Sequence, residues 1–188
     1  MPTGAILTYP AAGSEASNGA VITNEDGLYK RPVQSESMRP KFAILNPELT
    51  LSLPKELTAI GVGDWASHDI EHELSAIYDI PHGTGLSIVM PAWMLYVYSD
   101  APARFAAFAE QVFGVHDSSQ SVEAIALQGI NKLKAFFDQI GLPTHFGQVN
   151  IDQSRFSEMA KKCTQNGLLG NFKELNEEDV INILNLAM

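Results

Sequence analysis

Three of the five histidines of this chain lie close together in the sequence, at His68, His72 and His82. His68 and His72 are four residues apart, so a helix through this segment would place both rings on one face, about one turn apart. Pro81 and Gly83 flank His82 in a turn that can bring the third ring back toward that face. Imidazole is a common ligand of iron and zinc, and an open site with a few such ligands suits the polarisation of a carbonyl oxygen. The cluster is therefore a candidate metal site.

The spacing alone leaves a second interpretation open, because two histidines four residues apart are also typical of a solvated or hydrogen-bonded helix face. The HExxH helix of zinc proteases is excluded, since residues 68–72 read His-Asp-Ile-Glu-His and the glutamate does not follow the first histidine. His116 and His145 stand apart from the cluster, and we expect both to be solvated.

Most of the chain after residue 53 is predicted to be helical. Apolar residues recur at three- and four-residue spacing in the segments 103–113, 122–140, 154–163 and 176–186. Ser121 precedes the segment 122–140 as an N-cap and Gly141 ends it, while Asn176 caps the acidic first turn of the last segment. We therefore expect an all-helical domain over residues 54–188.

The segment directly after the histidines, residues 84–98, is apolar on nearly all sides. This pattern predicts a buried helix that ends or kinks near Pro91, with its methionine and aromatic side chains in the core. Such a helix would pack behind the histidines and keep water out of the site.

Residues 1–53 have a different character, rich in glycine, proline, serine and asparagine. They contain a turn signal at 24–27 and short β-prone runs at 5–8, 19–23 and 41–45. We expect strands and loops here, so the chain is predicted to be mainly α with a short strand-rich leader.

The overall charge limits the range of partners. With 12 lysines and arginines against 22 aspartates and glutamates, the net charge is −10, which disfavours nucleic acid as a ligand. No apolar run approaches the length of a membrane span, and the first residues lack a basic region followed by an apolar one, so we expect a cytoplasmic protein that does not bind membranes. Cys163 is the single cysteine and is interpreted as an incidental thiol on a helix.

The region around the histidines resembles a known family. Residues 64–76 (DWASHDIEHELSA), 81–83 (PHG) and 86–92 (LSIVMPA) are similar to the signature of the iron-containing (group III) alcohol dehydrogenases, most closely the butanol dehydrogenase and aldehyde reductase branch. The resemblance implies a dehydroquinate synthase-like helical domain. It also implies that His68 and His82 are two of four metal ligands and that His72 lies beside the substrate and the nicotinamide.

The leader shows a matching likeness. Residues 7–15 (LTYPAAGSE) look like the cofactor loop of the family, which implies contacts of Thr8, Gly13 and Ser14 with NAD(P)H. A glycine turn allows backbone amides to approach a phosphate or ribose closely. Ala12 replaces a residue that usually carries a hydroxyl group, which puts one hydrogen bond to the cofactor in doubt.

Two departures from the family pattern qualify this resemblance. In the family a doubly wound nucleotide-binding region precedes the matched segment, so the resemblance implies that residues 1–53 are a remnant of that domain. Near residues 62–63 the family continues into an Asp and a His four residues later, its other two ligands, and these are missing here, as in an internal deletion. Asp64 and His68 reproduce the spacing of the lost pair, so Asp64 is a further candidate ligand, although capping of the helix is its simpler role.

The resemblance implies an oxidoreductase that interconverts a primary alcohol and an aldehyde with NAD(P)(H), using Fe²⁺ or Zn²⁺ to polarise the substrate oxygen. In this abridged form we expect negligible turnover. The alternative is a non-catalytic remnant, a helical domain that binds metal or self-associates into a homo-oligomer. In that case apolar side chains once covered by lost helices would be exposed, with Trp93, Met94 and Leu95 as candidates.

Overall fold

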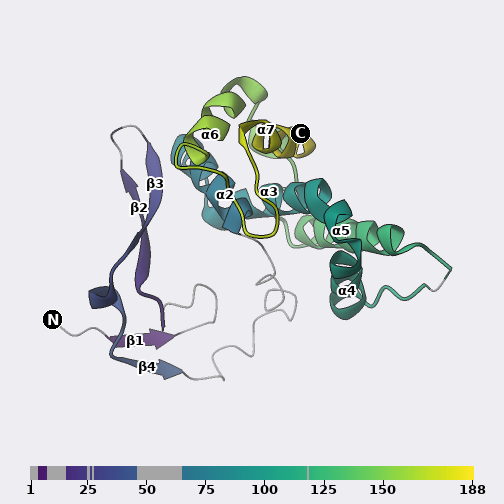
Figure 1. Ribbon diagram of the computed structural model, residues 1–188, viewed down its shortest axis with the longest axis horizontal. Helices are drawn as coiled ribbons and strands as arrows, with labels where there is room; N and C mark the ends of the chain where they lie inside the picture. The colour runs from purple at the N-terminus through teal and green to yellow at the C-terminus, as the bar shows by residue number, and fades with distance from the viewer. Residues whose placement is uncertain (1–3, 8–15, 25, 27, 46–64, 118) are drawn as a thin grey trace. The chain divides into compact units, whose positions relative to one another are not determined.

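The computed structural model describes residues 4–7, 16–24, 26, 28–45, 65–117 and 119–188. The chain forms two compact units, Met1–Val62 and Gly63–Met188. All strands of the described ranges lie in the first unit and all α-helices in the second (Figure 1). The expected domain boundary at residues 53–54 and the expected deletion at 62–63 lie outside the described residues. Among the described helices, none is long and apolar enough to cross a membrane.

The first unit contains two small sheets. Strand β1 (Gly4–Leu7) pairs in parallel with β4 (Phe42–Leu45), while β2 (Gly19–Asn24) and β3 (Tyr29–Gln34) form an antiparallel hairpin. A short 3₁₀ helix, η1 (Glu36–Met38), precedes β4. In the hairpin turn the backbone N–H of Asp26 donates to the Asn24 side chain at 3.0 Å. An asparagine commonly stabilises a turn in this way, and the sequence predicts a turn at residues 24–27. Strand β3 was not predicted, because its Lys, Arg and Pro lower its intrinsic strand preference and the pairing with β2 supplies it.

The second unit is built from helices, which confirms the predicted mainly α fold. They are α2 (Trp65–Tyr78), α3 (His82–Val97), α4 (Pro102–Phe113), α5 (Val122–Gln139), α6 (Phe156–Cys163) and α7 (Glu177–Leu186). Short 3₁₀ helices lie between them at η4 (Tyr98–Asp100), η5 (Phe146–Val149) and η6 (Gln153–Arg155).

The predicted helix ends are confirmed by the backbone. The Ser121 hydroxyl accepts from the N–H of Ala124 at 3.2 Å at the start of α5. Asn176 and Asp179 exchange side-chain to backbone hydrogen bonds of 3.0 and 2.8 Å at the start of α7. Beyond α5 the chain turns at Gly141, with a φ of +80°. Satisfying the free amides and carbonyls in this way ends the helices where the sequence places caps.

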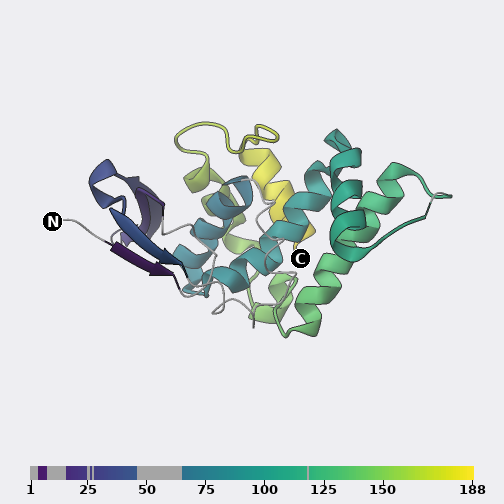
Figure 2. The same cartoon turned by 90° about the horizontal axis from the view of Figure 1, so that it is seen from below.

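Helix α3 is the centre of the helical unit and contacts α2, α5 and α7 (Figure 2). It continues past Pro91 to Val97, so of the two outcomes expected at Pro91, an end or a kink, the end is wrong. The proline removes one backbone hydrogen bond, but packing on three sides outweighs that loss. The expected exposure is wrong for Trp93 and Met94, which are 3% and 5% exposed, and Leu95 is half-buried. The Trp93 ring packs against aromatic side chains outside α3, with ring centres 6.1 to 6.3 Å away.

Candidate metal centre

Two helices and the turn between them position the histidines. His68 and His72 project from α2, and His82 is the first residue of α3. Helix α2 ends at Tyr78, and Asp79 then takes a left-handed conformation with a φ of +51° while its N–H donates to a carbonyl of the last turn at 3.0 Å. This tight reversal returns α3 alongside α2, so the turn carries His82 back toward the face of the other two rings.

The three rings converge as the spacing predicts. The ring centre of His82 lies 5.6 Å from that of His68 and 5.7 Å from that of His72. Two imidazoles that bind one metal ion through bonds of about 2.1 Å hold their ring centres roughly 5 Å apart. His82 is half-exposed and His72 is 5% exposed, so the site lies at the edge of a dry interior. The donor chemistry and the separations fit a borderline divalent ion such as iron or zinc.

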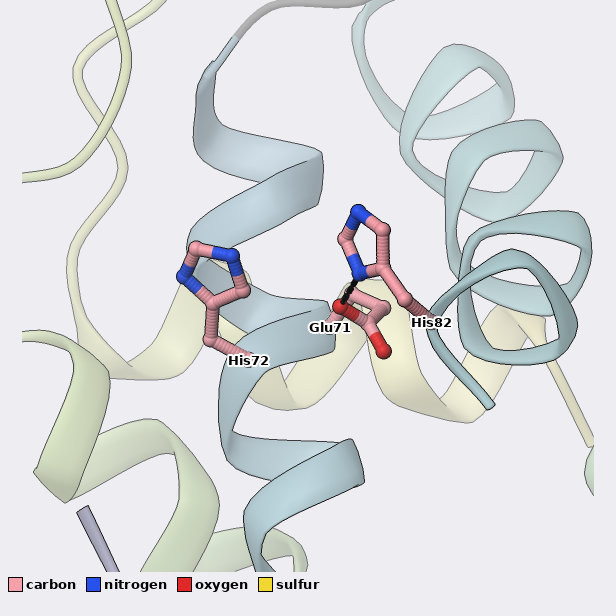
Figure 3. Close-up of side chains that lie close together, drawn as sticks. All are labelled: Glu71, His72 and His82. Atoms are coloured by element: carbon pink, nitrogen blue, oxygen red, sulfur yellow. Dashed lines mark hydrogen bonds and ion pairs between the residues drawn. The ribbon is translucent and has the colours of Figure 1, made fainter. Parts of the chain in front are cut away.

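A buried carboxylate lies directly beside this cluster (Figure 3). The Glu71 side chain is fully buried, and its Oε2 pairs with Nδ1 of His82. Its Oε1 accepts from the hydroxyl of Ser75, one turn further along α2. One donor atom each from Glu71, His72 and His82 lies within 4.8 Å of the others.

The first turn of α3 leaves room for that carboxylate only because residue 85 is glycine. A β-carbon on Gly85 would lie 2.6 Å from Oε1 of Glu71 and 2.7 Å from its Cγ. A β-carbon on Gly83, two residues earlier, would meet nothing within 4 Å. The close approach of α3 to α2 and the burial of Glu71 therefore depend on the same residue.

A second buried carboxylate on α2 has a different neighbour. Glu73 is also fully buried, and its Oε2 lies 3.8 Å from Nζ of Lys162 on α6. This ion pair links α2 to α6 and has a structural role, because a buried carboxylate needs a compensating charge.

An open cavity of about 320 Å³ lies beside the first turn of α3 and the end of α5. Its lining includes Thr84, Asp138 and Pro143, but none of the three histidines. The cavity is therefore separate from the candidate metal centre.

The structure brings together His68, His72 and His82, as the sequence predicts. Asp64 and the expected cofactor loop residues Thr8, Gly13 and Ser14 lie outside the described residues.

Two polar neighbours of the histidines, Glu71 and Ser75, were not predicted as part of the site. The available signal was their spacing: His68, Glu71, His72 and Ser75 recur at intervals that place them on one stripe of a helix.

Comparisons with known proteins relate the chain to one family. A family model described as "Fe-containing alcohol dehydrogenase family, C-terminal" matches residues 58–188. The chain is 32% identical to the probable NADH-dependent butanol dehydrogenase 1 of Bacillus subtilis, covering 100% of the chain and 66% of the relative. It is 28% identical to NADH-dependent butanol dehydrogenase A of Clostridium acetobutylicum, covering 97% and 65%. The crystal structure of NADH-dependent butanol dehydrogenase A from Thermotoga maritima matches with a TM-score of 0.82 and 29% identity, covering 100% and 66%.

The chain thus spans about two thirds of the length of these relatives. The match to the Bacillus protein runs over 257 residues, whereas the chain has 188. The relative therefore carries residues within the matched span that this chain lacks.

Proposed function

Because the chain belongs to the Fe-containing alcohol dehydrogenase family, we propose that it carries the metal-binding half of an oxidoreductase that interconverts a primary alcohol and an aldehyde with NAD(P)(H). This proposal rests on the convergence of three imidazoles from α2 and α3. The ring centre of His82 lies 5.6 Å from that of His68 and 5.7 Å from that of His72. Membership confirms the resemblance found in residues 64–92.

His68 and His82 are proposed to hold a divalent metal ion, Fe²⁺ or Zn²⁺. The bound metal would supply Lewis-acid polarisation of the substrate oxygen, and the nicotinamide would supply or accept the hydride. His72 faces His82 across 5.7 Å and can relay the proton that the oxygen gains or loses. The buried side chains of α3 exclude water from the inner side of the site, which strengthens electrostatic interactions there.

We expect negligible turnover from the 188-residue chain by itself. Hydride transfer requires the dinucleotide to be held against the substrate, and a poorly placed reactant costs much of the rate. The chain spans about two thirds of the length of its relatives, and the resemblance implies counterparts in it for two of the family's four ligands. Thr8, Gly13 and Ser14 are the proposed contacts with the cofactor, and Asp64 remains a weaker candidate for a further ligand.

Binding experiments test this proposal without requiring turnover. The protein is loaded with Co²⁺ as a visible substitute, and the absorption of the metal is followed while butan-1-ol or butanal is added. We expect a saturable spectral change in the wild type and in the His145→Ala control, whose histidine is exposed and outside the cluster, but not in His82→Ala. Metal-loaded wild type that shows no response to either compound would contradict the proposal.

A parallel assay of butanal-dependent oxidation of NADH or NADPH should stay near the blank rate. Turnover near the enzyme median of about 10 s⁻¹ would show that the shortened chain is sufficient. Concentration-dependent self-association in sedimentation, without metal or alcohol binding, would favour the non-catalytic alternative.

A further inference from the structure

We propose that Glu71 is the positioning residue of this centre: its buried carboxylate accepts the Nδ1 proton of His82 and thereby directs Nε2 of that ring toward the metal. The part that concerns the metal rests on the proposed function. The part that concerns the orientation of the ring rests on the geometry alone.

Both carboxylate oxygens of Glu71 have hydrogen-bond partners. Oε2 pairs with Nδ1 of His82, and Oε1 accepts from the Ser75 hydroxyl, whose oxygen also lies 3.1 Å from the carbonyl of Ile80. The side chain is fully buried, so no water compensates its charge from the surface. A buried carboxylate destabilises the fold unless hydrogen-bond donors compensate its burial, and here the donors are one imidazole and one hydroxyl.

The exposure of His82 complements this arrangement. Its side chain is 44% exposed, although its Nδ1 contacts a group with no exposure at all. In Figure 3 the Nδ1 side of the ring faces Glu71 and the other nitrogen lies on the opposite side. With the proton of the neutral ring held on Nδ1, the lone pair of Nε2 is available to a metal. Metal-binding histidines commonly donate their second ring nitrogen to a carboxylate in this way.

Direct coordination by Glu71 is the competing interpretation, because its donor atom lies within 4.8 Å of those of His72 and His82. To become a ligand, Glu71 would have to offer a lone pair that its contacts with His82 and Ser75 leave free, and this requires open space beside the carboxylate. The Glu71 side chain has little space to rotate, because it packs directly on the backbone of α3 at Gly85. Even a β-carbon at that position would lie 2.6 Å from Oε1. The closed packing around the carboxylate favours an orienting role over a coordinating one.

The first experiment measures the tautomer of His82 in the metal-free protein by ¹⁵N NMR of the imidazole. We expect the Nδ1–H form in the wild type and a shift toward the Nε2–H form in Glu71→Ala. Glu73→Gln is the matched control, because Glu73 is equally buried on the same helix but pairs with Lys162. An Nε2–H ring in the wild type, or the same tautomer in wild type and Glu71→Ala, would overturn the proposal.

The second experiment measures Zn²⁺ affinity in the full chain, with urea unfolding of each metal-free variant as the check on folding. Loss of an outer partner of a ligand typically weakens binding about 10- to 100-fold, so we expect roughly tenfold for Glu71→Gln, which keeps an acceptor oxygen, and more for Glu71→Ala. Glu73→Gln should lose stability while keeping its affinity.

Unchanged affinity in Glu71→Gln and Glu71→Ala, or a loss in Glu71→Gln as complete as in His82→Ala, would contradict the orienting role. The second of these results would make Glu71 a ligand. If the wild type bound no metal, the proposed function would fail, and the NMR measurement would still decide whether Glu71 orients His82.

Discussion

Replacing Gly85 by alanine should destabilise the helical unit, because the backbone of α3 packs closely on the Glu71 side chain of α2 at this glycine. The added β-carbon would lie 2.6 Å from Oε1 and 2.7 Å from Cγ of the buried Glu71 side chain. Glu71 cannot move away freely, since its carboxylate is held by His82 and Ser75.

The magnitude follows from two opposing effects. Adding a carbon to a packed interior costs about 1–3 kcal/mol, while alanine is favoured over glycine in a helix by about 1 kcal/mol. Gly83→Ala is the matched control, because it lies in the same first turn of α3 and its β-carbon would meet nothing within 4 Å. The two variants share the helix preference, so their unfolding free energies should differ by about 1–3 kcal/mol.

Urea unfolding of the two variants, followed by far-ultraviolet circular dichroism, measures this difference. Gly85→Ala should be the less stable variant and should also bind Zn²⁺ more weakly, because the displaced Glu71 no longer orients His82. If Gly85→Ala proves as stable as Gly83→Ala, the close packing of Gly85 on Glu71 is refuted.

Three further predictions concern the rest of the helical unit. A β-carbon on Gly129 of α5 would lie 2.4 Å from that of Ala109 on α4, so Gly129→Ala should lower the unfolding free energy by about 1–3 kcal/mol. Adding Ala109→Gly should recover part of that loss. Additive losses in the double-mutant cycle would argue against this contact. The Tyr96 hydroxyl donates to Asp179 at 2.5 Å, and this hydrogen bond, followed by burial, raises the pKa of Tyr96. The hydrogen bond therefore stabilises the fold fully below the ordinary tyrosine pKa of about 10, and this stabilisation is lost as the pH rises through the folded-state pKa. Tyr96→Phe should flatten the alkaline decline in unfolding free energy, measured by urea unfolding at several pH values. An unchanged decline would contradict this role of the hydrogen bond. Asp79→Gly should raise the unfolding free energy by about 1 kcal/mol or less, because glycine adopts the φ of +51° without steric cost; a lower thermal midpoint would show that the aspartate side chain contributes more than its backbone costs.

The helices were predictable because their ends are encoded locally. Ser121 and Asn176 cap α5 and α7 as their positions in the sequence indicate, and Gly141 follows α5 in a left-handed conformation. Capping depends on side chains within a few residues of the helix end, so no knowledge of the tertiary fold is needed.

The errors in the fold arose where distant contacts decide the outcome. Pro91 usually ends a helix, but α3 continues because α2, α5 and α7 surround it. Trp93 was considered for exposure on the assumption that lost helices leave a bare surface, but its ring packs against Phe105 and Phe172. The partners in other helices leave no signal in the local sequence, although the apolar pattern of residues 84–98 does predict a buried helix with its aromatic side chains in the core.

The candidate site was predictable in part for the same reason. The four-residue spacing of His68 and His72 and the turn before His82 are local features, and the structure brings the three rings together. The role proposed for Glu71 depends on a partner in the next helix and on the absence of a β-carbon at Gly85. Spacing along α2 places Glu71 on the correct face but does not identify that partner.

Whether the convergent histidines bind a metal is tested most directly by titrating Zn²⁺ and, without oxygen, Fe²⁺ into the wild type and its single histidine variants. We expect stoichiometric binding by the wild type and by the controls His116→Ala and His145→Ala, whose histidines are exposed, and loss of that binding in both His68→Ala and His82→Ala. Binding that is equally tight in His82→Ala and the wild type would show that the convergent histidines are not a metal centre.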